Sequence, residues 1–331
     1  MSKAGISRLS EIGMIRETVH GTNPGGLTRG ILVSAFSAKP IKATERVPEI
    51  SGKRLHRIVI GGGTYYEISF SIFAGPINAT AATVAELIHM IMGLDTVSGA
   101  GAPYTHKFTI KEASGLPSYT LYQKITNGVD VQYKVYSGFR INTLKITFNR
   151  DEKFVSCEAA GLALIEATDT TKTLIFSVDP IFSSRASNLT IGSADLSRYK
   201  SAVVNFENMA EVFNPLSSSV NASEILAKGL NISVEVDGLH SIDGSPILRP
   251  IFKVDTIQTS ELEIYVSDGT VNNKLSVVIP KYQVLELDNE NISGEDFIPE
   301  KATFAAIHDE DPAAMPYVEL IGAHNSDYDT I

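Results

Sequence analysis

The sequence has no tryptophan and only one cysteine among 331 residues, and these two absences restrict what the chain can be. Because Cys157 has no possible partner, there is no intrachain disulfide, which favours a reducing compartment and a buried, inert thiol. No apolar run reaches the length of a membrane span. The absence of tryptophan also weakens the case for a carbohydrate-binding surface, which commonly uses aromatic platforms.

Motifs for catalysis or metal binding are also absent. The seven histidines are scattered without an i,i+4 pair, so no zinc site is indicated. Gly61-Gly62-Gly63 lacks the Lys-Ser/Thr of a phosphate loop and precedes a predicted strand, which favours a turn. His308–Asp311 offers hard oxygen ligands to a divalent cation, although a solvated acidic stretch explains it better. We therefore predict no catalytic residue, no metal and no cofactor, and an enzyme is the least favoured alternative.

Negative charge is concentrated near the C-terminus. The formal net charge is −10, and residues 294–331 hold nine acidic residues against the single Lys301, a charge of −8. About −2 is left for the rest of the chain. This distribution lacks the basic surface expected of a protein that grips nucleic acid.

Alternating apolar and polar residues predict a mainly β fold. From 117 to 164 the alternation has a period of two, and Asn127-Gly128 is a strong hairpin signal. We predict four consecutive antiparallel strands here, joined by short turns: Tyr119–Ile125, Asp130–Tyr136, Phe139–Phe148 and Lys153–Ala159. The one principal helix is predicted over Thr83–Met92, with Thr80 or Thr83 as the N-cap and Gly93 as the terminator.

The second half of the chain repeats the element order of the first. In each half a strand, a long loop (37–63 and 207–229) and a second amphipathic strand follow one another. The second strands align as Ile68/Ile232, Ser69/Ser233 and Phe70/Val234. We therefore predict tandem duplicated β-sandwich or half-barrel modules. The expected divisions are an N-terminal arm (1–30), a first module (31–175), a second module (176–290) and an acidic C-terminal extension (291–331).

The sequence resembles the tail tube proteins of long-tailed bacteriophages over roughly residues 20–290. The stretches that carry this resemblance are Tyr104–Phe108, Tyr136–Ile146, Val203–Asn208, Gly229–Val234 and Leu275–Pro280. The resemblance implies a β-sandwich flanked by one helix, whose inner strands join those of neighbouring subunits into a barrel. Rings of subunits would stack through a long loop and the terminal arms into a tube.

The same resemblance assigns partners and a location. The chain would pair with itself in rings, as a trimer with pseudo-sixfold symmetry if it is duplicated or as a hexamer if it is not. It would also meet the tape-measure protein and the tail terminator and distal tail proteins. DNA would pass through the lumen without specific binding, and no membrane is involved. The protein would be assembled in the host cytoplasm and reside in the virion tail.

Residue roles follow from the alternation and from the resemblance together. The polar sides of the two aligned strands are predicted to face the lumen: Glu67, Ser69, Ser71, Asn231, Ser233, Glu235 and Asp237. A hydroxyl-rich, weakly acidic wall would repel phosphates and let DNA slide. Basic residues of the first long loop are predicted to make contacts between rings: Lys53, Arg54 and Arg57.

Two further expectations remain open at this stage. A phage or surface β-sandwich adhesin or baseplate protein that binds a receptor or glycan is the main alternative, and Tyr65-Tyr66 is the nearest candidate for its aromatic cluster. Residues 294–331 are predicted to extend away from the core, onto the tube exterior or across a subunit boundary. Their large apolar residues, such as Phe304, Val318 and Leu320, argue against simple disorder.

Overall fold

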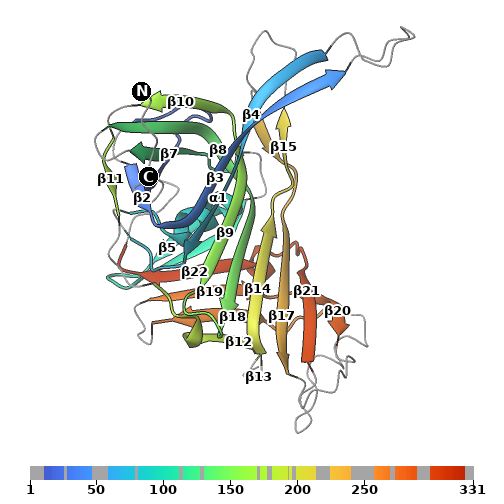
Figure 1. The fold of residues 1–331 in the computed structure, drawn as a ribbon. Coiled ribbons are helices and arrows are strands. Elements are labelled where there is room, and N and C mark those ends of the chain that lie inside the picture. The colour runs from blue at the N-terminus through green and yellow to red at the C-terminus, as the bar shows by residue number, and fades with distance from the viewer. Residues whose placement is uncertain are drawn as a thin grey trace, which may run out of the picture.

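The computed structural model of the chain is mainly β, with one α-helix among the residues that it describes (Figure 1). The prediction of a mainly β fold with one principal helix is thereby confirmed. The structure describes residues 11–25, 28–46, 59–78, 81–111, 115–126, 130–169, 172–176, 181–192, 194–195, 199–213, 224–239, 257–268, 273–288 and 299–324.

A sheet of thirteen strands runs through both halves of the chain. Its strands are β1 (Glu11–Arg16), β2 (Thr28–Ile31), β3 (Val33–Arg46), β4 (Val59–Phe73), β7 (Tyr119–Thr126), β8 (Val131–Asn149), β9 (Ser156–Ala163), β10 (Ile165–Asp169), β11 (Leu174–Ile175), β14 (Tyr199–Glu207), β17 (Asn231–Leu239), β20 (Tyr282–Asp288) and β21 (Pro299–Ala306).

Eight of these strands form one continuous antiparallel surface in the order β3-β4-β9-β8-β14-β17-β21-β20. We call β3-β4-β9-β8 the first half-sheet and β14-β17-β21-β20 the second half-sheet. Each half-sheet begins with two strands in chain order, β3-β4 and β14-β17, and each ends with two later strands in reversed order, β9-β8 and β21-β20. The strand order is therefore repeated, and strands β8 and β14 join the two copies side by side (Figure 1).

A second sheet of seven strands crosses the first and also draws on both halves (Figure 1). Its order is β13-β12-β18-β19-β22-β6-β5, and most of its buried side chains share one core with the large sheet. Its strands are β5 (Gly93–Ser98), β6 (Tyr104–Ile110), β12 (Ser187–Ile191), β13 (Ala194–Asp195), β18 (Leu262–Ser267), β19 (Lys274–Ile279) and β22 (Tyr317–Gly322). Short 3-10 helices occupy Ser184–Ala186 and Pro312–Ala314, and β15 (Ala210–Phe213) pairs only with β16 (Glu224–Ala227).

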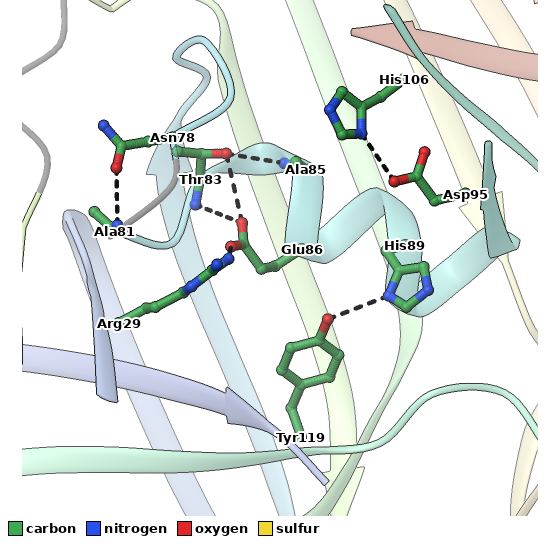
Figure 2. Close-up of polar contacts among 10 residues, drawn as sticks. All are labelled: Arg29, Asn78, Ala81, Thr83, Ala85, Glu86, His89, Asp95, His106 and Tyr119. Carbon is green, nitrogen blue, oxygen red and sulfur yellow. Dashed lines mark hydrogen bonds and ion pairs between the residues drawn. The ribbon is translucent and has the colours of Figure 1, made fainter. Parts of the chain in front are cut away.

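Helix α1 (Val84–Met92) is buried on every side and fills the first half of the core. Thr83 is its N-cap: the Thr83 hydroxyl accepts from the Ala85 amide, and the Glu86 carboxylate accepts from the Thr83 amide (Figure 2). Gly93 ends the helix in the left-handed conformation, with φ 98°. The predicted helix is confirmed, with Thr83 rather than Thr80 as its cap.

The prediction of four strands between 119 and 159 is wrong in one respect. Ser137-Gly138 is not a turn, and the two middle strands form the single strand β8. Gly138 has φ 74°, and the pairing with β7 shifts register at this point. Strand β8 bends here, so that its first part pairs with β7 and β10 and its last part with β9 and β14.

The described segments nearest the two chain ends, 11–25 and 299–324, are more firmly integrated than the sequence indicates. Residues 11–16 of the predicted N-terminal arm form β1 between β2 and β7, with Ile12 and Met14 buried. The prediction that residues 294–331 extend away from the core is also wrong. Strand β21 lies between β17 and β20, and β22 joins β19 to β6, because Phe304, Val318 and Leu320 bury their side chains in the common core.

Candidate functional site

The predicted polar strands lie on one face of the eight-stranded surface. One row of paired residues crosses every strand from β3 to β20: Ala35, Ser71, Glu158, Lys145, Asn205, Ser233, Ala305 and Gln283. Ser71 and Ser233, from different halves, thus share one row. Because side chains alternate between faces, the other predicted lumen residues of β4 and β17 lie on this same face. We call it the polar face.

The predicted lumen residues differ in exposure along the polar face, but none of them is buried. Glu67, Ser69, Asn231 and Glu235 are exposed, while Ser71, Ser233 and Asp237 are half-buried. The opposite face is buried in the core, through side chains such as Phe70, Leu144, Phe206, Val234 and Phe304. One sheet therefore has a wet side and a dry side across both halves.

Carboxylates outnumber cations on the polar face. The charged residues with described side chains between β3 and β20 are Glu67, Glu158, Glu207, Glu235, Asp237 and Glu286 against Lys39, Arg140, Lys145 and Lys301. Lys301 lies 3.9 Å from Asp237, and the Asn205 amide donates to Glu235 at 3.2 Å. Strands β3, β4, β9, β8 and β14 also border a hollow of about 510 Å³ on this part of the sheet. The described side chains of this face therefore carry a net negative charge, which disfavours the approach of phosphate groups.

The eight-stranded surface has two open edges among the described residues. Strand β3 pairs only with β4, and β20 pairs only with β21 apart from one bridge between Tyr282 and Gln258. Pro40 lies in β3 and cannot donate a backbone hydrogen bond. The core-facing side chains at the edges, Phe36 and Leu287, are only partly buried. Open edges of this kind are the usual places where one sheet joins another.

The first predicted loop is largely strand. Tyr66 is the first residue of β4 that pairs with β9, and on its N-terminal side β4 pairs only with β3, so that the two strands form a two-stranded arm (Figure 1). The arm therefore comprises residues 40–46 and 59–65. The predicted ring-stacking residues Lys53, Arg54 and Arg57 lie beyond it, outside the described residues. The loop prediction failed because Pro40 and Gly61–Gly63 indicate loops, although a two-stranded edge tolerates both.

The second long connection is anchored on the first half-sheet. The Asn208 amide donates to the Asn142 carbonyl at 2.7 Å, and the Ala210 amide donates to the Asn142 side chain at 2.7 Å. The buried guanidinium of Arg140 donates to the Ile225 carbonyl of β16. A small apolar cluster of Leu164, Ile225, Tyr65, Leu162, Ala210 and Val212 covers this contact. The sequence did not indicate Arg140 or Asn142, because each lies within an apolar strand pattern.

The buried carboxylate of Glu17 fixes the bend in β8. Its oxygens accept hydrogen bonds from the Gly138 amide and the Thr120 hydroxyl at 2.7 Å, the Ser118 hydroxyl at 2.7 Å and the Gly21 amide at 2.8 Å. A methyl group at Gly138 would lie 2.9 Å from the Leu164 side chain. Four donors around one carboxylate explain how an acidic residue is tolerated at 6% exposure.

Other buried polar groups tie elements together rather than form a reactive centre. Arg29 pairs with Glu86 at 2.8 Å, and His89 meets the Tyr119 hydroxyl at 3.2 Å (Figure 2). Burial raises the pKa of Glu86, and the Arg29 charge opposes this rise. His106 bonds Asp95 at 2.8 Å and the carbonyl of His324 at 2.9 Å, which links β5 and β6 to the residues after β22.

Within the described ranges, no group of three or more His, Cys, Asp or Glu side chains is arranged to hold a metal ion. No helix in this part of the chain is long and apolar enough to span a membrane. Cys157 is fully buried, and burial raises the pKa of its thiol. Tyr65 and Tyr66 are half-buried, with Tyr66 packed 5.7 Å from Tyr136, so these two residues do not form an exposed aromatic platform.

Comparison with known proteins agrees with this arrangement. No individual curated protein matches the sequence. The sequence model of the phage tail tube protein family, in contrast, matches residues 7–305, which is most of the chain and includes the eight strands of the polar face apart from Ala306, the last residue of β21. The chain therefore belongs to the phage tail tube protein family.

Proposed function

We propose that the chain assembles with itself into stacked rings whose polar faces line a continuous lumen, the conduit for genome delivery. The repeated strand order of the two half-sheets is the observation that carries this proposal. Each half-sheet would contribute one equal section of a closed barrel wall, which abolishes the open edges. The residues at the lumen would be Glu67, Ser69 and Ser71 together with Asn231, Ser233, Glu235 and Asp237.

The junction between β8 and β14 supplies a template for the contact between chains. Strands β8 and β20 hold equivalent places in their half-sheets, as do β14 and β3. In the internal junction Leu144 pairs with Phe206 and Lys145 with Asn205. Transferred to the edges, this register pairs Val284 of one chain with Ala38 of the next, and Glu286 with Ser37.

Three chains would complete one ring if six half-sheets close the barrel. The proposed divisions place the modules at about 31–175 and 176–290, and the topology supports adding β21 to the second module. The ring would have threefold symmetry with a pseudo-sixfold wall, because helix α1 has no described counterpart in the second half. The tape-measure protein would occupy the lumen before DNA, and the terminator and distal tail proteins would close the two tube ends.

Mass measurement on isolated rings tests the stoichiometry. We expect about three times the chain mass of 35.7 kDa, and a mass near six times this value would overturn the three-chain ring. The register is tested by placing cysteines at Ser37 and Glu286. Because facing Cβ atoms in adjacent strands lie about 4.5–5.5 Å apart, oxidation should give interchain disulfides and a covalent product that ends at three chains. The paired control S69C/E286C, one strand further in, should not cross-link.

The proposed assembly belongs to the virion tail and is built in the host cytoplasm. The acidic, hydroxyl-bearing polar face supports passage of DNA without specific binding, since counterion release on a cationic surface is the main source of nonspecific affinity. We expect no measurable binding of duplex DNA to the assembled protein at physiological salt. Retention of DNA by assembled tubes in a filter assay would contradict this part of the proposal.

A further inference from the structure

Three large apolar side chains are exposed together at one end of the first half-sheet. Leu32 is 55% exposed, Phe73 41% and Phe154 39%. The rings of Phe73 and Phe154 meet edge to face, with centroids 5.4 Å apart. Leu32 and Phe73 border one shallow hollow together with Pro76 and Ile181. We call Leu32, Phe73 and Phe154 the apolar rim.

The apolar rim interrupts a polar pattern. Along β4 the exposed side carries Glu67, Ser69 and Ser71, and Phe73 is the next residue on that side. A lumen wall alone does not explain an exposed phenylalanine there, since water would solvate a serine at lower free-energy cost.

The second half-sheet is polar at the equivalent place. The pair Val33 and Ile72 in the first half-sheet is equivalent to the pair Ala202 and Val236 in the second. One position further along, the second half-sheet has Ser201 paired with Asp237. Asp237 in turn lies 3.9 Å from Lys301. Leu32 and Phe73 therefore have polar counterparts in the second half-sheet, so among the described residues this exposed apolar pair occurs once per chain, which points to a partner that also occurs once per chain.

One such partner is the arm. The apolar rim lies where β3 begins and β4 ends, and the arm extends from the other end of the same two strands, where Arg46 pairs with Val59. If copies are stacked along the strand direction, the arm of one copy points toward the rim of the next, a head-to-tail contact. Residues 40–46 alone span about 23 Å at about 3.3 Å per residue.

The sequence beyond the arm complements the rim in chemistry. Residues 47–58 join β3 to β4 and contain four aliphatic residues, Val47, Ile50, Leu55 and Ile58. The same segment holds Lys53, Arg54 and Arg57. Beside the rim, Asp151 and Glu152 are exposed, with Lys153 as the one cation between them and Phe154.

We propose that the apolar rim is the docking site for residues 47–58 of a second copy of this chain in the adjacent ring. This inference rests on the proposed assembly into stacked rings and adds the receiving surface to it. The aliphatic residues of the segment cover Leu32, Phe73 and Phe154, and its basic residues face Asp151 and Glu152. Each chain then has one donor segment and one acceptor surface, so the contact propagates without end along the tube.

Engineered cysteines test the contact in assembled tubes. The variants carry L32C together with one cysteine at Val47, Ile50, Leu55 or Ile58, and the buried Cys157 leaves the background low. We expect oxidation of tubes to give at least one variant with a ladder of covalent multimers that extends well beyond the number of chains in a ring. A ladder that stops at the ring number would overturn the proposal, because the contact would then lie within one ring.

Two controls separate this proposal from the assembly on which it rests. Microscopy first establishes that each variant forms tubes, so failure of the proposed function is seen before any cross-linking. S201C replaces L32C in the matched control, since Ser201 holds the equivalent place in the second half-sheet, and we expect no ladder from it. The absence of a ladder from every L32C variant in intact tubes would overturn the proposal.

A second measurement uses the rim without cysteines. We expect F73S to lower the urea midpoint of the unassembled chain only slightly, because Phe73 is 41% exposed and its main contact is the half-exposed Phe154, and to reduce the yield of tubes at least tenfold. S71A, on the same strand, should change neither. If F73S tubes form normally from purified protein, the rim serves another occupant, such as cargo in the lumen, and ring stacking uses a different surface.

Discussion

The first and second half-sheets have the same strand order but differ outside the shared surface. The last strand of the first half-sheet, β8, has an additional N-terminal part before the bend at Gly138, which pairs with β7 and β10, whereas its counterpart β20 begins only at Tyr282. The first half-sheet extends into an arm, whereas the matching connection in the second folds back onto its neighbour through Asn208 and Ile225. The repeat is thus regular within the eight-stranded surface, and it diverges at the bend in β8 and at the connections between strands.

The largest expected effect comes from removing the strand that completes the second half-sheet. A chain that ends at Ser293 lacks β21 and β22, and with them the buried Phe304, Val318 and Leu320. Because β21 separates β17 from β20, we expect no cooperative unfolding transition in urea. A chain that ends at residue 324 is the control and should unfold like the parent. Folded, tube-forming protein from the shorter chain would show that β21 is dispensable.

A core substitution in the same strand sharpens the comparison between the half-sheets. Phe304 is fully buried and packs edge to face on Tyr282 at 5.4 Å, whereas the equivalent position in β9 is the small Ala159. We expect F304A to lower the free energy of unfolding by about 3–5 kcal/mol, measured in urea, because it opens a cavity. L285A, on the adjacent strand at a 52% exposed position, should cost no more than about 0.5 kcal/mol. Equal costs would mean that the second half-sheet is loosely packed.

The bend in β8 should be the next most sensitive feature, since only the first half-sheet has it. We expect G138A to cost about 1–3 kcal/mol, because an alanine at φ 74° is strained and its methyl group meets Leu164. E17Q should lower the free energy of unfolding by about 1–3 kcal/mol in the same urea assay, because the NH2 group of the new glutamine would face the amide and hydroxyl donors that now surround the carboxylate. G229A lies in open space and is the control. A stable G138A variant would show that the bend relaxes at low cost.

Regular features of this fold could be predicted from the sequence, and its irregular ones could not. The alternation in β4 and β17 and the capped helix are local patterns, and the residues concerned carry the pattern themselves. The alignment of Ser69 with Ser233 even anticipated that both lie on one polar face. The bend at Gly138 was missed, because a serine-glycine pair indicates a turn unless a distant carboxylate such as Glu17 holds the chain extended.

The chain ends were misjudged for a related reason. Composition near the C-terminus is acidic, and acidic residues suggest a solvated tail. In strands, however, alternate positions can be charged while the others enter the core, as in β22, where Val318 and Leu320 are buried on either side of Glu319. Long-range pairing decided the outcome, and a single sequence contains no direct record of which distant strand is the partner.

The smallest expected effect is a dependence of stability on pH. Burial lowers the pKa of His20 to about 4, with the Arg140 charge as a second cause, and burial lowers the pKa of His324 to about 4, helped by the charges of Arg29 and His106. Both pKa values in the folded chain lie below 6.5, the ordinary histidine pKa that we expect in the unfolded chain. The unfolded state therefore binds more protons than the folded state between pH 4 and 6.5. The stability present above pH 6.5 should therefore decline as the pH falls toward 4.

Urea midpoints across this range measure the effect and its source. H324N should reduce the decline in the urea midpoint, because it removes the titrating group beside the seven-stranded sheet. H20N should also reduce it, because it removes the titrating group near Glu17. The double variant is expected to flatten it most. If both single variants keep the full pH dependence, other groups, such as carboxylates, dominate acid unfolding.

Pro40 and the bridge between Tyr282 and Gln258 lie at the same level when the two open edges are aligned in the proposed register. In the register that pairs Val284 with Ala38, Pro40 of one chain falls opposite Tyr282 of the next. Pro40 has no amide hydrogen to give, and the amide and carbonyl of Tyr282 are already bonded to Gln258. Both strands therefore stop offering hydrogen bonds at the same place. In the proposed ring, a slip of two residues that lengthened the ladder past this point would bury an unmatched proline, so the proposed seam would contain a stop that fixes the alignment of its subunits.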